Sequence, residues 1–132
     1  MATSTRTMLM EAVGSYVRRW SDVGQAAARA RSVPANRLTA LLIVLLYNAA
    51  GFADVATTAQ AMGMGAHEAN PIVRGFMDLL AAYWVVPKLG SQLLVTAMIL
   101  WFPHRFVLAV FSLAVAATCA VVWNNVQVIA SL

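Results

Sequence analysis

Long apolar runs separated by short polar breaks dominate the last two thirds of the chain. The first run begins at Leu38 and becomes more polar only towards Met64. A helix rises about 1.5 Å per residue, so about 20 residues cross the 30 Å apolar core of a bilayer. The pattern therefore predicts three transmembrane helices, over residues 38–60, 82–102 and 106–126.

Two polar breaks separate these spans. The first, GMGAHEANP, contains two glycines and ends in Asn70 and Pro71. Asparagine is a good helix N-cap, and proline suits the first helical turn because no backbone donor is needed there. We predict that a short interfacial helix over residues 71–80 begins here and precedes the second span, in which Pro87 is a candidate kink. The second break, at residues 103–105, is a minimal turn.

The segment before the first span has a helical pattern of its own. Its apolar residues recur at spacings of three and four, with charged residues on the opposite side; they are Leu9, Val13, Tyr16, Val17 and Trp20. We predict an N-terminal amphipathic helix in residues 1–37. It either lies in the cytoplasmic headgroup layer or is a partly ordered leader that only sets topology. The expected fold is thus an all-α membrane protein, with this leader before a three-span transmembrane domain over residues 38–132.

Composition supports a membrane protein. Of the 132 residues, 61% are hydrophobic and 11% are charged, whereas about a quarter of an ordinary soluble domain is charged. A chain this short has too little interior to hide so much apolar surface. A soluble enzyme and a nucleic-acid-binding module are both poor fits, so we expect the lipid bilayer as a partner and no nucleic acid.

The distribution of positive charge sets the expected topology. Six of the nine basic residues precede the first span, namely Arg6, Arg18, Arg19, Arg29, Arg31 and Arg37. Positive charge beside a spanning helix marks the cytoplasmic side. We expect a multi-pass protein of the cell (inner) membrane, with a cytoplasmic N-terminus and the C-terminus outside.

Two charged residues fall inside the predicted spans. An Asp or Lys near the centre of a membrane helix costs about 2.5–3.5 kcal/mol, so such residues usually face the interior of a bundle. Asp54 lies about 24 Å along the first span, and Lys88 lies about 9 Å into the second, which runs the opposite way. Because the two depths match, we predict an Asp54–Lys88 ion pair in the outer half of the bilayer.

Other polar residues are expected at the same level. Helical spacing places Thr57 and Thr58 near Asp54, and Gln92 on the face of Lys88. Asn124 and its neighbour Asn125 reach this level from the third span, and the loop brings in Glu68 and Asn70. The predicted polar cluster is Asp54, Thr57, Thr58, Glu68, Asn70, Lys88, Gln92 and Asn124. It is either a structural clasp that fixes helix packing or a cleft that binds a headgroup, a small polar solute or a proton.

No pattern for catalysis, for a cofactor or for a metal is recognisable. The common nucleophile and zinc-hydrolase motifs are missing from the sequence. His67 and His104 are predicted on opposite sides of the membrane, so a zinc site would lack ligands. Cys119 is a lone thiol in an apolar run, where it is interpreted as a small packing residue. We therefore predict no catalytic, cofactor-binding or metal-binding residues.

One combination of motifs resembles a known group of proteins. Asp54 with Thr57 and Thr58, followed by the motif Glu68-Ala69-Asn70-Pro71 and then by Lys88, resembles a family of small three-helix prokaryotic membrane proteins of unknown function. The resemblance covers residues 38–125 and excludes the leader. It implies no reaction, and it implies that the family shares a polar constellation formed by Asp54, Thr58, Glu68, Asn70, Pro71 and Lys88.

The expected function is that of a small, non-catalytic integral membrane protein. Small residues on the third span suit close helix contact, so we expect a structural or accessory subunit, either as a homo-oligomer or within a larger membrane complex. One alternative is a subunit of a transporter or proton-conducting oligomer. Another is a membrane enzyme that binds or processes a lipid headgroup with Asp54 or Glu68.

Overall fold

The computed structural model of the chain describes residues 2–132, with side chains described from Thr7 onward. This part of the chain is helical and contains no strand. Its elements are α1 (Ala2–Ser32), α2 (Pro34–Gly63), α3 (Pro71–Leu80), the 3₁₀-helix η1 (Ala81–Trp84), α4 (Val85–Trp101) and α5 (Arg105–Ser131). Three segments are long and apolar enough to cross a membrane, namely Pro34–Gly63, Pro71–Trp101 and Arg105–Ser131. The predicted all-helical fold with three candidate spans is confirmed at this level.

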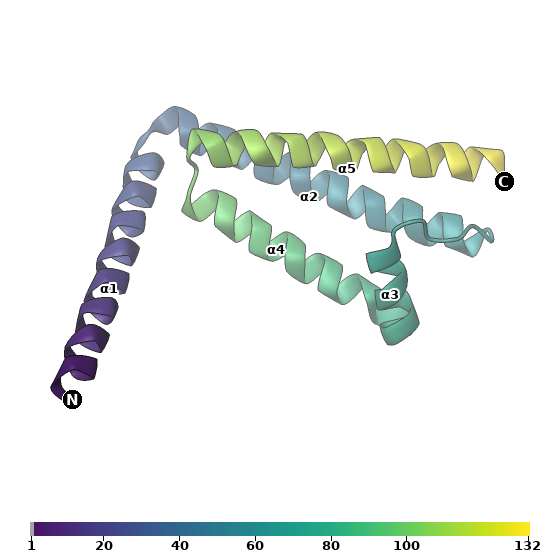
Figure 1. The fold of residues 1–132 in the computed structure, drawn as a ribbon. Coiled ribbons are helices and arrows are strands. Elements are labelled where there is room, and N and C mark those ends of the chain that lie inside the picture. Colours follow the sequence, from purple (N-terminus) through teal and green to yellow (C-terminus); the bar gives the residue numbers. More distant parts are fainter. Residues whose placement is uncertain (1) are drawn as a thin grey trace.

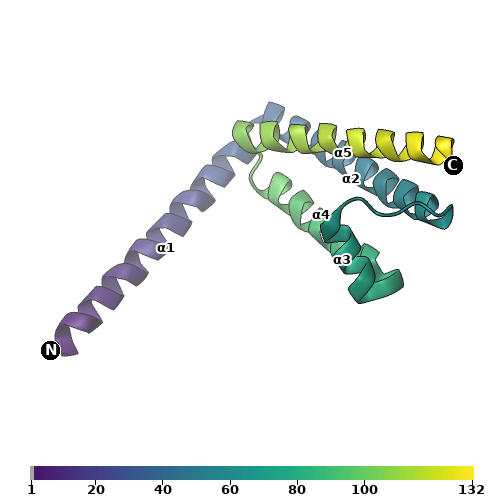
Figure 2. The same cartoon turned by 45° about the vertical axis from the view of Figure 1, so that its right-hand side comes forward.

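The three long helices of the bundle form a wedge. Figures 1 and 2 show α2 and α5 side by side and running in the same direction, while α4 runs the opposite way. The α2–α5 contact is the most extensive, α4 packs mainly on α2, and α4 barely touches α5. In both views α4 diverges from α2 and α5 towards the end where α3 lies. We call that end of the bundle the open end, and the end near α1 the closed end.

An apolar core holds the closed end together. Ile99 of α4 is fully buried there, between residues of α2 and α5. The core consists of Ala40, Ile43, Ile99 and Leu108, with Val44, Val95, Phe111 and Val115 packed against it. In the turn between α4 and α5, His104 caps α5, because its Nδ1 accepts a hydrogen bond from the backbone N–H of Phe106 at 3.3 Å. Side-chain packing therefore fixes the relative positions of the three helices at this end.

Helix α1 leaves the bundle at the closed end and extends away from it (Figures 1 and 2). Only Val33 separates it from α2, which begins at Pro34. Arg31 donates a hydrogen bond to the backbone carbonyl of Trp101, the last residue of α4. A positive side chain at the C-terminus of a helix also complements the helix dipole. Arg31 thus links the end of α1 to the end of α4.

The helix boundaries differ from the predicted ones in instructive ways. The short helix predicted over residues 71–80 is confirmed with its cap, because Asn70 Oδ1 accepts from the backbone N–H of Ile72 at 3.0 Å. Before α4, however, Ala81 has a φ of 48° and a 3₁₀-turn follows, so the second α-helix starts at residue 85 rather than 82. Pro87 consequently lies in the first turn of α4, where a missing N–H costs little, rather than inside a longer helix that it would kink.

The other two spans are longer than expected. Helix α2 starts four residues earlier and ends three residues later than the predicted 38–60. Helix α5 continues to Ser131 rather than ending at residue 126, because no helix breaker occurs in the sequence NNVQVIASL. The leader is helical over Ala2–Ser32. The helical state predicted for the leader is therefore confirmed.

Candidate functional site

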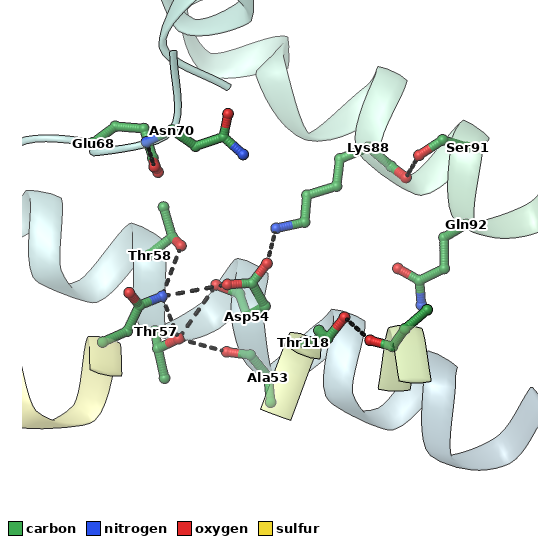
Figure 3. Close-up of polar contacts among 12 residues, drawn as sticks. Ala53, Asp54, Thr57, Thr58, Glu68, Asn70, Lys88, Ser91, Gln92 and Thr118 are labelled. Carbon is green, nitrogen blue, oxygen red and sulfur yellow. Dashed lines mark hydrogen bonds and ion pairs between the residues drawn. The ribbon is translucent and has the colours of Figure 1, made fainter. Parts of the chain in front are cut away.

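An ion pair joins α2 to α4 at the open end of the bundle. Lys88 Nζ donates to Asp54 Oδ2 (Figure 3). The side chains of Lys88 and Asp54 are 21% and 14% exposed, so both are largely buried within the bundle. The ammonium group also lies 5.9 Å from the centre of the Trp84 ring, within the range of a cation–π contact. The predicted pair is present, and each charge has its counter-charge within the fold.

Asn125 joins α5 to the same cluster. Its Nδ2 lies 3.3 Å from Asp54 Oδ1, 3.2 Å from Thr57 Oγ1 and 3.1 Å from Thr58 Oγ1. Thr57 donates its own proton to the backbone carbonyl of Ala53 at 2.9 Å, which leaves its oxygen free to accept (Figure 3). Asp54, Thr57, Thr58, Lys88 and Asn125 therefore form one polar cluster that connects all three long helices.

Asn124, which was predicted to join this cluster, does not. Its side chain is exposed and lines a hollow beside the cluster, whereas the next residue makes the hydrogen bonds. Successive residues of an α-helix are 100° apart, so only one of the two amides can face α2. The rotation of α5 about its own axis selects Asn125.

Gln92 was also predicted to join the cluster, and it belongs to a different one. Its Nε2 donates to Asn48, at 3.0 Å to Oδ1 and 3.2 Å to the backbone carbonyl. Asn48 in turn donates to Thr96 Oγ1 at 2.9 Å. We call Asn48, Gln92 and Thr96 the amide network. It lies between α2 and α4 on the closed-end side of the ion pair, about one helical turn away along α4.

The amide network depends on a glycine. Gln92 is 5% exposed, and its amide lies against Gly51 of α2. A Cβ at position 51 would lie 2.7 Å from Gln92 Cδ, which is closer than a real Cβ approaches any heavy atom. The missing side chain therefore allows the two helices to exchange hydrogen bonds at this level.

Glu68 and Asn70 organise the loop that leads into α3. Glu68 Oε1 accepts from the backbone N–H of Asn70 at 2.7 Å, while the Arg74 Nε donates to the backbone carbonyl of Glu68 at 3.0 Å. Neither residue is bonded to the Asp54–Lys88 pair. Figure 3 nevertheless shows both side chains across from the pair, with the Glu68 carboxylate on the side of Thr58.

A cavity of about 530 Å³ lies between the loop and the polar cluster. It exists because α4 diverges from α2 and α5 at the open end, and α3 closes part of the gap. Its polar lining includes Asp54, Thr58, Glu68, Asn70, Lys88 and Asn125. Its apolar lining includes Val73, Phe76, Trp84, Pro87 and Val121. A neighbouring hollow of about 450 Å³ shares the Glu68 and Thr58 walls. Both volumes fall within the range of about 300–1,000 Å³ that is typical of small-molecule sites.

The chemistry available in this cavity differs from residue to residue. Both carboxylate oxygens of Asp54 are engaged, one by Lys88 and the other by Asn125. Glu68 is half-buried, and within the described part of the chain its Oε2 makes no hydrogen bond. Nowhere between Thr7 and Leu132 do three His, Cys, Asp or Glu side chains gather where they could share a metal ion. Glu68 is therefore the group of this cavity best placed to meet a ligand.

Comparison of the chain with protein-family models, with curated proteins and with solved structures gives no match. The resemblance indicated by the Glu-x-Asn-Pro motif therefore rests on that motif and its flanking residues alone.

Proposed function

We propose that this chain is a multi-pass membrane protein that acts as a non-catalytic accessory subunit. In this proposal it associates through the outer faces of its spans, with copies of itself or with a larger membrane complex. The observation that supports it most directly is how little of the spans the fold covers. In their most apolar windows, only 22%, 17% and 11% of the residues of the three candidate spans are buried.

Small residues interrupt this uncovered surface. Ala116 and Ala120, four residues apart on α5, are both exposed. On α4, Gly90 is exposed, and a Cβ built there would meet nothing within 4 Å. Lipid chains cover large apolar side chains well, whereas small residues let the backbone of another helix approach closely. These two faces are therefore suited to helix–helix association.

The same proposal places α1 in the headgroup layer of the cytoplasmic surface. Its apolar side is uncovered, with Leu9, Tyr16 and Trp20 between 56% and 62% exposed. Tyrosine and tryptophan favour the interface between lipid and water, and arginines on the same helix would attract anionic headgroups. The direction of α1, away from the bundle at the closed end, is compatible with this position (Figure 2).

Orientation follows from the charges at the two ends of the bundle. Seven of the nine basic residues lie on α1, at the start of α2 or at the start of α5, all of which belong to the closed end. We propose that this end is cytoplasmic and that the cavity faces the outer leaflet of the inner membrane. In a Cys119→Ala background, an impermeant maleimide should label His67→Cys in intact cells and Ser32→Cys only after permeabilisation. The reverse pattern would contradict the proposed topology.

Association is tested by measuring mass without removing the native lipid. After gentle extraction into nanodiscs, we expect a homo-oligomer or a complex of defined stoichiometry with a partner. Ala116→Leu should weaken it, because a larger side chain separates the helices. Ala56→Leu is the matched control, since Ala56 is exposed on a face of α2 that already presents Phe52. A strictly monomeric protein without a partner would overturn the proposal.

A further inference from the structure

We propose that the cavity at the open end binds an amphiphile through a single ammonium group, which is held by the Glu68 carboxylate. This inference does not depend on whether the chain is an accessory subunit. It rests on three features of the cavity: its balance of charge, the nature of its remaining walls, and the hydrogen bonds already made by the groups that line it.

Charge is the first feature. Three charged side chains line the cavity, namely Asp54, Glu68 and Lys88. Asp54 and Lys88 neutralise each other, so the negative charge of Glu68 remains. Arg74 is close by, but its guanidinium bonds to the backbone carbonyl of Glu68, and Arg74 does not line this cavity. A ligand with one positive charge would therefore complete the balance, whereas an anion would face the uncompensated carboxylate of Glu68.

The hydrogen bonds point in the same direction. Glu68 Oε1 is occupied by the backbone N–H of Asn70, while Oε2 is not engaged by any described residue. An ammonium group is a pure donor, and a charge-assisted bond to a carboxylate is stronger than a neutral one. The charge of Lys88, in contrast, is already balanced within the fold, because its ammonium donates to Asp54 and lies over the Trp84 ring.

The remaining walls describe the rest of the ligand. On the α3 side they are formed by Val73 and Phe76, and on the α4 side by Trp84 and Pro87. Such walls suit an apolar body. The predicted ligand thus has an ammonium head and an aliphatic or aromatic body. Two sources share this chemistry: an ethanolamine phospholipid and a free amphiphilic amine.

Binding is tested on the full chain in nanodiscs with two matched probes, hexylammonium and hexyl sulfate. Fluorescence of Trp84 reports occupancy, in protein in which Trp20, Trp101 and Trp123 are replaced by phenylalanine. We expect hexylammonium to bind at least tenfold more tightly than hexyl sulfate. Equal binding of the two probes, or tighter binding of the sulfate, would overturn the proposal. This test uses the native Glu68 and needs no substitution there.

Substitution of the carboxylate then tests the residue itself. Glu68→Gln keeps an amide oxygen that can accept from the Asn70 N–H, so the loop should retain its fold while losing the charge. We expect hexylammonium to bind about tenfold more weakly, which corresponds to about 1.4 kcal/mol. Glu11→Gln on α1 makes the same chemical change at an exposed residue far from the cavity, and it should leave binding unchanged. Unaltered binding in Glu68→Gln would overturn the assignment.

The source of the ligand is distinguished by native mass spectrometry from bilayers with equal amounts of phosphatidylethanolamine and phosphatidylglycerol. Retention of phosphatidylethanolamine, lost in Glu68→Gln, identifies the lipid as the ligand. Hexylammonium binding without retained phosphatidylethanolamine identifies a free amine. Retention of phosphatidylglycerol in preference would contradict an ammonium site.

Discussion

Replacement of Gly51 by alanine tests how closely α2 and α4 approach each other. In an ordinary helix interior this substitution is favourable by about 0.8–1 kcal/mol, because alanine is the better helix former. Here the new Cβ would lie 2.7 Å from both Cδ and Nε2 of Gln92. The Gln92 amide would have to shift, and its two hydrogen bonds to Asn48 depend on its present position.

The expected magnitude follows from these contacts. Each lost hydrogen bond removes about 1 kcal/mol, and a buried polar group left without a partner costs about 1–3 kcal/mol. After subtraction of the gain in helix propensity, we expect Gly51→Ala to destabilise the protein by about 2 kcal/mol. In a Gln92→Ala background the obstacle is absent, so the same substitution should become neutral or stabilising by about 1 kcal/mol.

Reversible unfolding in mixed micelles, followed by far-ultraviolet circular dichroism, measures both effects. Gly75→Ala on α3 provides the matched control, because Gly75 is exposed and a Cβ there would meet nothing within 4 Å. It should be neutral or stabilising in both backgrounds. The reasoning would be refuted if Gly51→Ala were as harmless as Gly75→Ala, or if its cost persisted after removal of the Gln92 amide.

Three further predictions concern the open end. Asp54→Ala and Lys88→Ala should each destabilise the protein more than the double substitution does, because either single change leaves a largely buried charge unpaired. The same assay should give a coupling of about 1 kcal/mol or more between the two residues, and simple additivity would show that the pair has no energetic role. Asn125→Leu should lower the free energy of unfolding by about 1–3 kcal/mol, because its hydrogen bonds to α2 are lost, whereas Asn124→Leu should have little effect. Equal losses would contradict the assigned rotation of α5. Asn70→Ala removes the N-cap of α3, so it should lower the free energy of unfolding by about 1 kcal/mol and should increase amide hydrogen exchange in α3 first. Unchanged exchange in α3 would contradict this role.

The sequence predicted correctly those parts of the fold that depend on neighbouring residues or on regular helix geometry. The short helix over residues 71–80 was predicted correctly because its cap, Asn70, and its first residue, Pro71, are adjacent in the sequence. The Asp54–Lys88 pair is correct because depth in an antiparallel helix pair depends only on rise and topology, both of which are regular. The same argument, applied more widely, would have found the amide network. Asn48 lies six residues before Asp54, and in an antiparallel register it faces the region four to eight residues beyond Lys88.

Other features depend on packing and cannot be obtained from spacing along one helix. The choice between Asn124 and Asn125 requires the rotation of α5 against α2, which the apolar core at the closed end sets. The cavity requires the divergence of α4, which results from tight packing at one end and a polar connection at the other. The turn at Ala81 was not predicted either, since no glycine or asparagine marks its positive φ.

The position of Lys88 on a short helix has a consequence for biogenesis. Helix α4 has 17 residues, so it is about 26 Å long, slightly less than the apolar thickness of a bilayer. On its own it would enter lipid with an unpaired ammonium group. Its counter-charge, Asp54, is on α2, which the ribosome completes first. Insertion of residues 71–101 should therefore be inefficient in isolation and should improve when α2 precedes them in the same chain. Asp54→Ala should remove much of that improvement in a cell-free insertion assay, and equal insertion with and without α2 would show that the order of synthesis is irrelevant.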